Sequence, residues 1–379
     1  MTNDKEPIMI SIEEVSAAFE SRDYRQAAQL LKVLIADDPR NPWVQFYVGR
    51  LYEETNKPEA AAKVYRKLLQ QATQPKVLGQ ARQGLQRLEA AEKERRTQAI
   101  AEAKQDPNQR QPGILVLEPI NPDRKTEAAQ RFAKIVQLQP YSARLLLPTR
   151  TWRLYRTGPI GELRFLVSEL RQGEIPSFCT TIEAIEALPV FRIQYFHSLS
   201  PTPTVICQNP ANQLGKLPFQ WTEVTQIVEA LLPIFKPVAV QNHRRTRTTY
   251  KEKTSDYIGM CDLHLPGRNC ILRLCQETYQ FHQGAHLTPL LGHSLKDGNT
   301  KIDSLSSNLK WQTLLKFLKE QIPHAAIWSD FTPFAETALP HSEMLSRITP
   351  HIELLRYLSS DWEPAFQLYS SLLLLRPKL

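Results

Sequence analysis

The apolar positions of residues 41–72 follow two helical periods in succession. Apolar side chains of the first period recur three or four positions apart, at Trp43, Phe46, Tyr47, Leu51 and Tyr52. Asn-Lys-Pro at residues 56–58 then interrupts the pattern, and a proline suits the first turn of a helix. A second stripe follows at Ala61, Val64, Tyr65, Leu68 and Leu69. This pattern predicts a helical hairpin, in which small residues at Gly49 and Ala61 let the two helices approach closely.

Part of the pattern recurs with a period of 34 residues. The earlier copy has Ala27, Leu31 and Leu34 where the later copy has Ala61, Tyr65 and Leu68. A period of 34 with small and aromatic residues at these offsets resembles the tetratricopeptide repeat (TPR) family. Residues 42–75 carry the resemblance best and residues 8–41 more loosely, so it covers about a quarter of the chain. Residues 76–92 are expected to form a third first helix or a capping helix.

The TPR resemblance implies a groove that binds a protein partner. In this family the inner face is lined mainly by first helices and holds an extended peptide or a partner's helix. The matching positions here are Trp43, Phe46, Arg50 and Glu53. The family's carboxylate clamp has Lys and Asn where this chain has Phe46 and Arg50, so binding of a C-terminal carboxylate is not expected. The alternative is that Trp43 and Phe46 cover the chain's own C-terminal domain. The whole chain also loosely resembles uncharacterised TPR proteins of cyanobacteria.

A change of pattern near residue 112 indicates a domain boundary. We expect TPR-like helical repeats with a capping helix over 1–92, and a charged helix and linker over 93–112, where "DPNQRQPG" breaks the helix. Residues 113–208 then alternate strand, helix, strand, helix, strand, as in a small α+β unit, for which we consider a ferredoxin-like arrangement. A second α+β region with a helical C-terminus is expected over 209–379. The expected fold class is therefore α+β, with N-terminal all-α TPR hairpins followed by a larger α+β region.

The second α+β region contains an apparent duplication. Residues 222–235, "TEVTQIVEALLPIF", are predicted to form an amphipathic helix before a short strand. Residues 311–328 show the same order of an aromatic residue, a helix, a proline and a strand. Between the two copies, residues 257–281 predict two strands around a Pro-Gly turn at 266–267. The tail, residues 341–379, is predicted to be helical, with its Leu-rich end packed on a core.

Composition narrows the class of protein. The chain has 379 residues, which favours two or three domains. It has no apolar run long enough to span a bilayer, and "MTNDKEPIMISIEE" lacks the features of a signal peptide, so we expect a cytoplasmic protein. Five scattered cysteines argue against a disulfide framework. Neither GxGxxG nor a phosphate-loop motif is present, so we expect no cofactor, and the sequence identifies no small-molecule substrate.

The net charge of +8 suggests at most a weak affinity for anionic partners. Basic residues concentrate in "NHRRTRTTYKEK", at Arg244, Arg245, Arg247, Lys251 and Lys253. Such a cluster can contact phosphates, and with Tyr250 it can form a surface for single-stranded RNA. The alternative, which we favour, is a solvated loop or hairpin tip, because no aromatic RNA-binding motif is visible.

The sequence gives less support for a metal site, a catalytic site or a glycan-binding site. Cys261, His264, Cys270 and Cys275 offer zinc ligands, but Cys270 and Cys275 would point to opposite faces of a strand. We therefore expect no metal site. Neither a nucleophile elbow nor HExxH occurs, so we expect no catalytic residue and no enzyme. Residues 151–179 resemble the strand–helix–strand half of a SPOR domain, a glycan-binding family, which we attribute to a shared α+β shape.

The sequence favours a non-enzymatic adaptor or assembly factor. A TPR groove would dock a partner segment, and the α+β body would supply a second surface. The alternative is an RNA- or anion-binding protein that uses residues 244–253.

Overall fold

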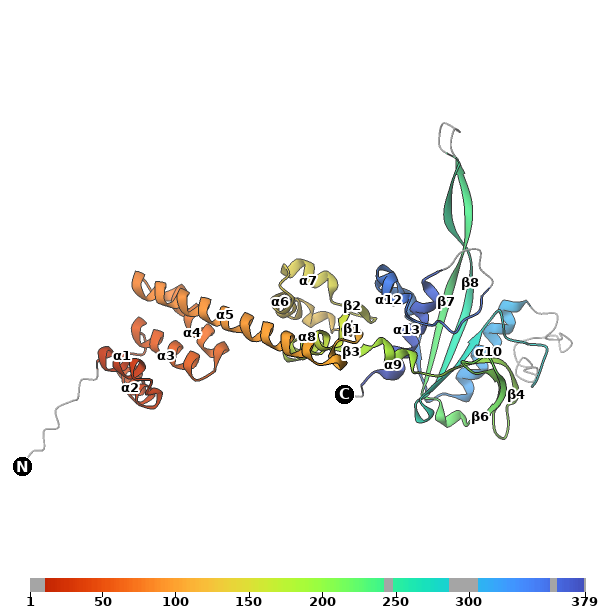
Figure 1. The fold of residues 1–379 in the computed structure, drawn as a ribbon, viewed down its shortest axis with the longest axis horizontal. Coiled ribbons are helices and arrows are strands. Elements are labelled where there is room, and N and C mark those ends of the chain that lie inside the picture. The colour runs from red at the N-terminus through yellow and green to blue at the C-terminus, as the bar shows by residue number, and fades with distance from the viewer. Residues whose placement is uncertain (1–10, 242–247, 286–305, 355–359, 378–379) are drawn as a thin grey trace, which may run out of the picture. The chain divides into compact units, whose positions relative to one another are not determined.

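The structure, a computed structural model, describes residues 11–241, 248–285, 306–354 and 360–377 (Figure 1). The chain divides into two compact units, Met1–Glu102 and Ala103–Leu379, here called unit 1 and unit 2. Each unit has its own apolar cores. The division supports an all-α part followed by an α+β part, as the sequence predicted.

Unit 1 is built from helices alone in its described part. The helices are α1 (Ile12–Glu20), α2 (Tyr24–Asp37), α3 (Pro42–Glu54), α4 (Pro58–Gln71) and α5 (Pro75–Gln105), of which α5 continues into unit 2. Side chains of Ser11, Asp23 and Asn41 accept backbone N–H bonds at the starts of α1, α2 and α3. Proline begins α3, α4 and α5, where its missing N–H costs no helical bond. Residues 93–105, expected to form a charged helix, continue the helix that starts at Pro75.

Tyr65 organises the packing of unit 1. Its ring is fully buried and lies against the backbone of α3 at Gly49 and of α5 at Gly84. A Cβ atom at either glycine would come within 2.6 Å of this ring. The predicted close approach at Gly49 is thus confirmed, and α5 packs where the first helix of a third repeat would lie.

The first part of unit 2 contains a three-stranded antiparallel sheet in the order β2–β1–β3. Its strands are β1 (Pro112–Leu117), β2 (Arg153–Pro159) and β3 (Ser177–Thr181), and its helices are α6 (Lys125–Val136), α7 (Pro140–Leu146), α8 (Ile160–Gln172) and α9 (Ile182–Glu186). Both β2 and β3 run antiparallel to β1, so they are parallel to each other and α8 connects them. This split β-α-β arrangement has three strands, whereas the ferredoxin-like unit that we considered has four.

A seven-stranded sheet forms the second part, in the order β10–β7–β8–β9–β4–β5–β6. Its strands are β4 (Val190–Ser198), β5 (Thr204–Gln208), β6 (Leu214–Pro218), β7 (Gln226–Gln241), β8 (Thr248–Leu265), β9 (Cys270–Cys275) and β10 (Ala326–Trp328). The Pro-Gly turn predicted at 266–267 joins β8 to β9, as expected. The boundary that we placed between residues 208 and 209 falls inside this sheet, because β5 and β6 pair along their whole length.

The helix that we predicted over residues 222–235 is wrong, because most of this segment is strand β7. Both faces of β7 are covered: Ile227 joins one core of the sheet, and Val228 and Leu232 join the other. A strand covered on both faces loses its alternation of apolar and polar residues, so it can imitate a buried helix. The predicted duplication is therefore wrong. The first copy is a strand, whereas the second contains a helix, α10 (Ser307–Gln321).

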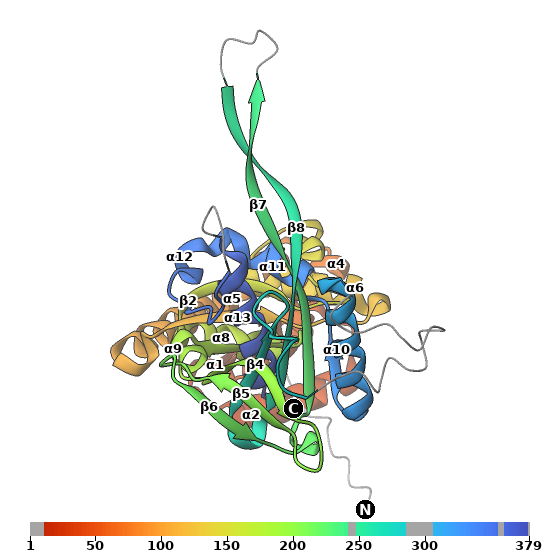
Figure 2. The same cartoon turned by 90° about the vertical axis from the view of Figure 1, so that its right-hand side faces the viewer.

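The core of unit 2 lies between its two sheets. Helices α11 (Phe331–Ala338) and α13 (Trp362–Leu375) share one apolar cluster with residues of both sheets, and α12 (Ser342–Leu345) joins them. Helix α10 covers the opposite face of the large sheet, and α6, α7 and α8 cover the opposite face of the small one (Figures 1 and 2). The predicted tail helix is confirmed in part: α13 is helical and is buried from Glu363 to Leu373, whereas the described residues 346–354 of the same tail are not helical. In the described part of the chain, we find no helix with the length and apolarity needed to cross a membrane.

Candidate functional site

The structure places the predicted groove residues mainly inside unit 1. Phe46 is only 3% exposed and packs against the rings of Trp43, Tyr47 and Tyr65. Phe46 therefore belongs to the core, and a partner has no access to it, contrary to our prediction. Trp43 is half-buried, so part of its ring remains accessible.

The two charged groove residues have partners within unit 1. Glu53 accepts a hydrogen bond from the Tyr65 hydroxyl at 2.7 Å and forms a two-pronged ion pair with Arg87 of α5, at 2.7 and 2.9 Å. The guanidinium of Arg50 stacks over the Phe19 ring, 5.1 Å from its centroid. Burial and the Glu53 carboxylate both raise the pKa of Tyr65, so this phenol remains a donor. Phe46, Arg50 and Glu53 thus join successive helices, which is a structural role.

A hollow that the sequence did not reveal lies on another side of unit 1. It has a volume of about 450 Å³ and is lined by the α2–α3 connection, the start of α3 and the last turns of α4. Arg40 and Lys67 supply positive charge, and Pro42 and Val64 supply apolar surface. The lining comes from two separate segments, 39–45 and 64–72, and only the packing of the hairpins brings the two together.

The basic segment is only partly described. Arg244, Arg245 and Arg247 lie outside the described residues, and Lys251 is placed only as a backbone position in β8. Lys253 is exposed and lies directly opposite Lys236 of β7, which is also exposed. These two residues belong to the two-stranded ribbon of β7 and β8 that extends beyond the rest of the sheet (Figures 1 and 2).

The cysteine and histidine set is dispersed over two faces of the large sheet. Cys261 and Cys270 belong to the core beneath α10, whereas Cys275 belongs to the core beside α13, as strand alternation predicted. Among the described residues, no three His, Cys, Asp or Glu side chains gather as metal ligands would. Burial raises the pKa of the thiols of Cys207, Cys261, Cys270 and Cys275.

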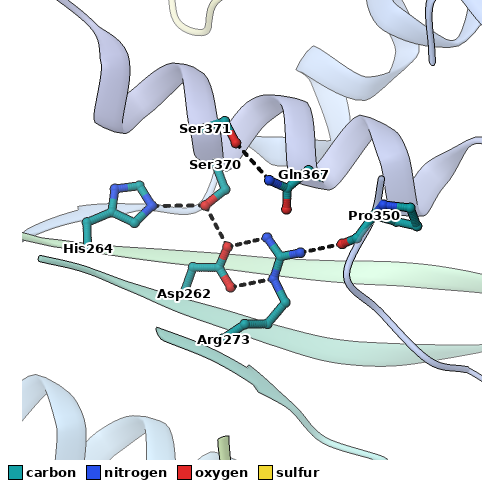
Figure 3. Close-up of polar contacts among 7 residues, drawn as sticks. All are labelled: Asp262, His264, Arg273, Pro350, Gln367, Ser370 and Ser371. Atoms are coloured by element: carbon teal, nitrogen blue, oxygen red, sulfur yellow. Dashed lines mark hydrogen bonds and ion pairs between the residues drawn. The ribbon is translucent and has the colours of Figure 1, made fainter. Parts of the chain in front are cut away.

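A buried polar cluster connects the large sheet to α13 (Figure 3). Arg273 of β9 donates two hydrogen bonds to the Asp262 carboxylate of β8, at 2.9 and 2.6 Å, and a third to the carbonyl of Pro350, at 2.5 Å. Ser370 of α13 donates to the same carboxylate at 2.6 Å and lies 2.9 Å from Nε2 of His264. All four side chains are at most 2% exposed. Beside them, Gln367 donates to Ser371 at 2.9 Å.

The order of hydrogen bonds in this cluster does not activate a nucleophile. The single hydroxyl proton of Ser370 goes to Asp262, so Nε2 of His264 must donate to Ser370. In a catalytic triad the histidine lies between the serine and the acid and accepts the hydroxyl proton. Burial and the charge of Arg273 lower the pKa of His264 to about 4, although Asp262 opposes them. The cluster therefore contains a neutral histidine and a stabilised ion pair, and its side chains are buried.

Comparison with known proteins supports the presence of helical repeats in unit 1. The family model of the tetratricopeptide repeat matches residues 18–79, which include α2, α3 and α4. The chain therefore contains tetratricopeptide repeats, a type of module that generally mediates protein–protein interaction. No curated protein and no solved structure matches the chain, so the cyanobacterial resemblance stays a prediction.

Proposed function

We propose that this protein is a non-enzymatic adaptor whose unit 1 docks a segment of a protein partner. The observation that carries the proposal is the stacking of two helical hairpins and α5 with a period of 34 residues. Glu53 and Arg87, which pair, are separated by that period, and Gly49 and Gly84 contact the same tyrosine. Stacked repeats of this kind present an extended surface to a partner.

The hollow beside α4 is the surface that we assign to the partner. It combines the cations of Arg40 and Lys67 with the apolar surface of Pro42 and Val64. An extended peptide with one acidic and one apolar side chain satisfies both features, because the acid pairs with a cation and the apolar group leaves water. Trp43 and Arg50 are then at most peripheral contacts.

A photo-cross-linking amino acid tests the assignment in the full-length protein. We would place it at Lys67, inside the hollow, and in a matched variant at the neighbouring exposed Arg66, which lies outside it. Irradiation of cells that express each variant should yield a discrete cross-linked protein only from position 67. The identity of that protein would follow from mass spectrometry.

A pair of charge variants provides the control. Lys67→Glu should abolish cross-linking from a probe at Gln71, also in the hollow, whereas Arg66→Glu makes the same change of charge and should leave it intact. Equal cross-linking from positions 66 and 67, or equal loss in the two charge variants, would contradict docking in the hollow.

The finer role that we propose is an assembly factor that works in the cytoplasm. All five cysteines carry free thiols, which is typical of a reducing compartment. In this proposal unit 2 presents a second surface, so that two proteins are held by one chain. A partner that binds unit 2 while unit 1 is occupied would support it.

A second candidate function is phosphate binding by the β7–β8 ribbon. Lys236 and Lys253 lie opposite each other and both are exposed, and like charges in this position repel unless an anion lies between them. A two-stranded ribbon also fits the major groove of DNA. Binding to single- and double-stranded nucleic acid, measured at two salt concentrations, should then weaken in Lys236→Gln/Lys253→Gln but not in Lys32→Gln/Lys63→Gln.

A further inference from the structure

Helix α7 exposes an apolar stripe at the surface of unit 2. Leu138, just before the helix, is 39% exposed, Tyr141 is 76% exposed and Leu145 is 63% exposed. Tyr141 and Leu145 are four residues apart and therefore lie on one face of the helix. Ala143, on the opposite face, is fully buried in the core with α6 and α8. Helix α7 is thus anchored by one face and presents large apolar side chains on the other.

The surroundings of this stripe are basic. Residues 128–156 contain six arginine or lysine residues and no aspartate or glutamate. Arg131 pairs with Glu174, but Lys134, Arg144 and Arg150 are exposed and form no ion pair with any described residue. Arg144 adjoins Leu145 and lies one turn from Tyr141, so this cation lies directly beside the apolar stripe, and Lys134 and Arg150 lie within a few residues of its two ends in the chain.

Exposed apolar side chains with exposed cations nearby in the chain match the boundary of an anionic bilayer. Leucine enters the acyl region, tyrosine prefers the headgroup level, and arginine and lysine attract anionic headgroups. Helices α6 and α7 lie at the end of unit 2 opposite α10 (Figure 1).

We propose that Leu138, Tyr141 and Leu145, together with Lys134, Arg144 and Arg150, form a docking surface for an anionic lipid membrane. The protein would bind at the membrane surface through these side chains and would not span the bilayer. The attachment is reversible, because three apolar side chains bury little area compared with a lipid anchor. The proposal is independent of the hollow in unit 1.

Vesicle sedimentation with the full-length protein tests this proposal. The protein should co-sediment with phosphatidylcholine vesicles that contain phosphatidylglycerol and remain in solution with phosphatidylcholine alone. Raised salt should weaken the binding. Lys134→Gln/Arg144→Gln/Arg150→Gln should lower the partition coefficient at least about tenfold, since each cation contributes separately. Tyr141→Ser/Leu145→Ser should lower it by a similar factor at every salt concentration.

Leu214→Ser is the matched control for the apolar change, because Leu214 is 66% exposed in β6 and far from α7 in the chain. It should bind vesicles as the unchanged protein does. Circular dichroism would verify that each variant is folded. The proposal is overturned if the unchanged protein does not co-sediment with anionic vesicles at low salt. That result is expected if the stripe instead binds an acidic protein. It is also overturned if Leu214→Ser reduces binding as much as Tyr141→Ser/Leu145→Ser.

Discussion

Two glycines of unit 1 differ from a third in what surrounds them. At Gly49 and Gly84 the ring of Tyr65 occupies the space that a Cβ atom would need, whereas nothing lies within 4 Å of that position at Gly79. Gly79 and Gly84 are both in α5. The contrast separates the steric effect of a methyl group from its effect on helix propensity.

Gly84→Ala should destabilise unit 1 by about 1–3 kcal/mol, because Tyr65 must move from its buried position. Gly79→Ala should instead stabilise the protein by up to about 1 kcal/mol, since alanine favours the helix more than glycine does. Urea denaturation followed by helical circular dichroism measures both changes. Destabilisation of equal size in the two variants would refute the packing role of Gly84.

His264 should make the stability of unit 2 depend on pH. Its pKa is lowered to about 4 in the folded state, compared with about 6.5 in an unfolded chain. The unfolded state therefore takes up a proton first as the pH falls. Above pH about 6.5, His264 therefore does not lower the free energy of unfolding of unit 2. As the pH falls toward 4, protonation of the unfolded state lowers this free energy by about 3 kcal/mol.

Urea denaturation between pH 7 and 4.5 tests this expectation against His264→Gln, which keeps a donor toward Ser370 but does not titrate. The loss of stability on acidification should be smaller in the variant. The same loss in both proteins would mean that other groups, carboxylates included, cause the acid sensitivity.

At the scale of elements, the Asp262–Arg273 pair joins β8 and β9 and holds α13 through Ser370 (Figure 3). Arg273→Met should cost about 3–5 kcal/mol, because it leaves the Asp262 carboxylate buried without its cation. Asp262→Leu/Arg273→Met should cost less than Arg273→Met alone, since both charges are absent. Thermal unfolding of the two variants gives the comparison.

The exposed pair of Arg347 and Glu343 offers a matched control. Arg347→Met should change the stability by less than about 1 kcal/mol, as is usual for surface ion pairs. If Arg273→Met changed the stability by as little as Arg347→Met, the buried cluster would not hold α13 in place.

The sequence predicts some elements of this chain well and others poorly, for physical reasons. The helices around Tyr65 are amphipathic, so their periodicity predicts both the elements and the close approach at Gly49. The β7 segment is covered on both faces, so periodicity favoured a helix. The prediction of Phe46 as a contact failed because a family position does not show how deeply a side chain is buried. The hollow at Lys67 and the cluster at Asp262 combine distant segments, which no local pattern reveals.

At the scale of the whole molecule, the separate cores of the two units predict two unfolding transitions. Phe366 is fully buried in α13 and packs on Phe331. Phe366→Ala should cost about 3–5 kcal/mol and shift only the transition of unit 2. Gly84→Ala should shift only the transition of unit 1. Scanning calorimetry resolves the two, and a single transition moved by both variants would show that the units unfold together.

The central position of α13 has a consequence for the order in which the protein is made. Every strand of both sheets precedes α13 in the chain, yet this helix lies between the sheets and contacts residues as distant as Trp152. On the ribosome, the inner faces of both sheets therefore emerge before the helix that covers them. Unit 1 can complete its packing early, because its contacts are local. The apolar strands of unit 2 remain exposed until α13 has emerged from the ribosome. Nascent chains with such exposed surfaces are the usual clients of chaperones.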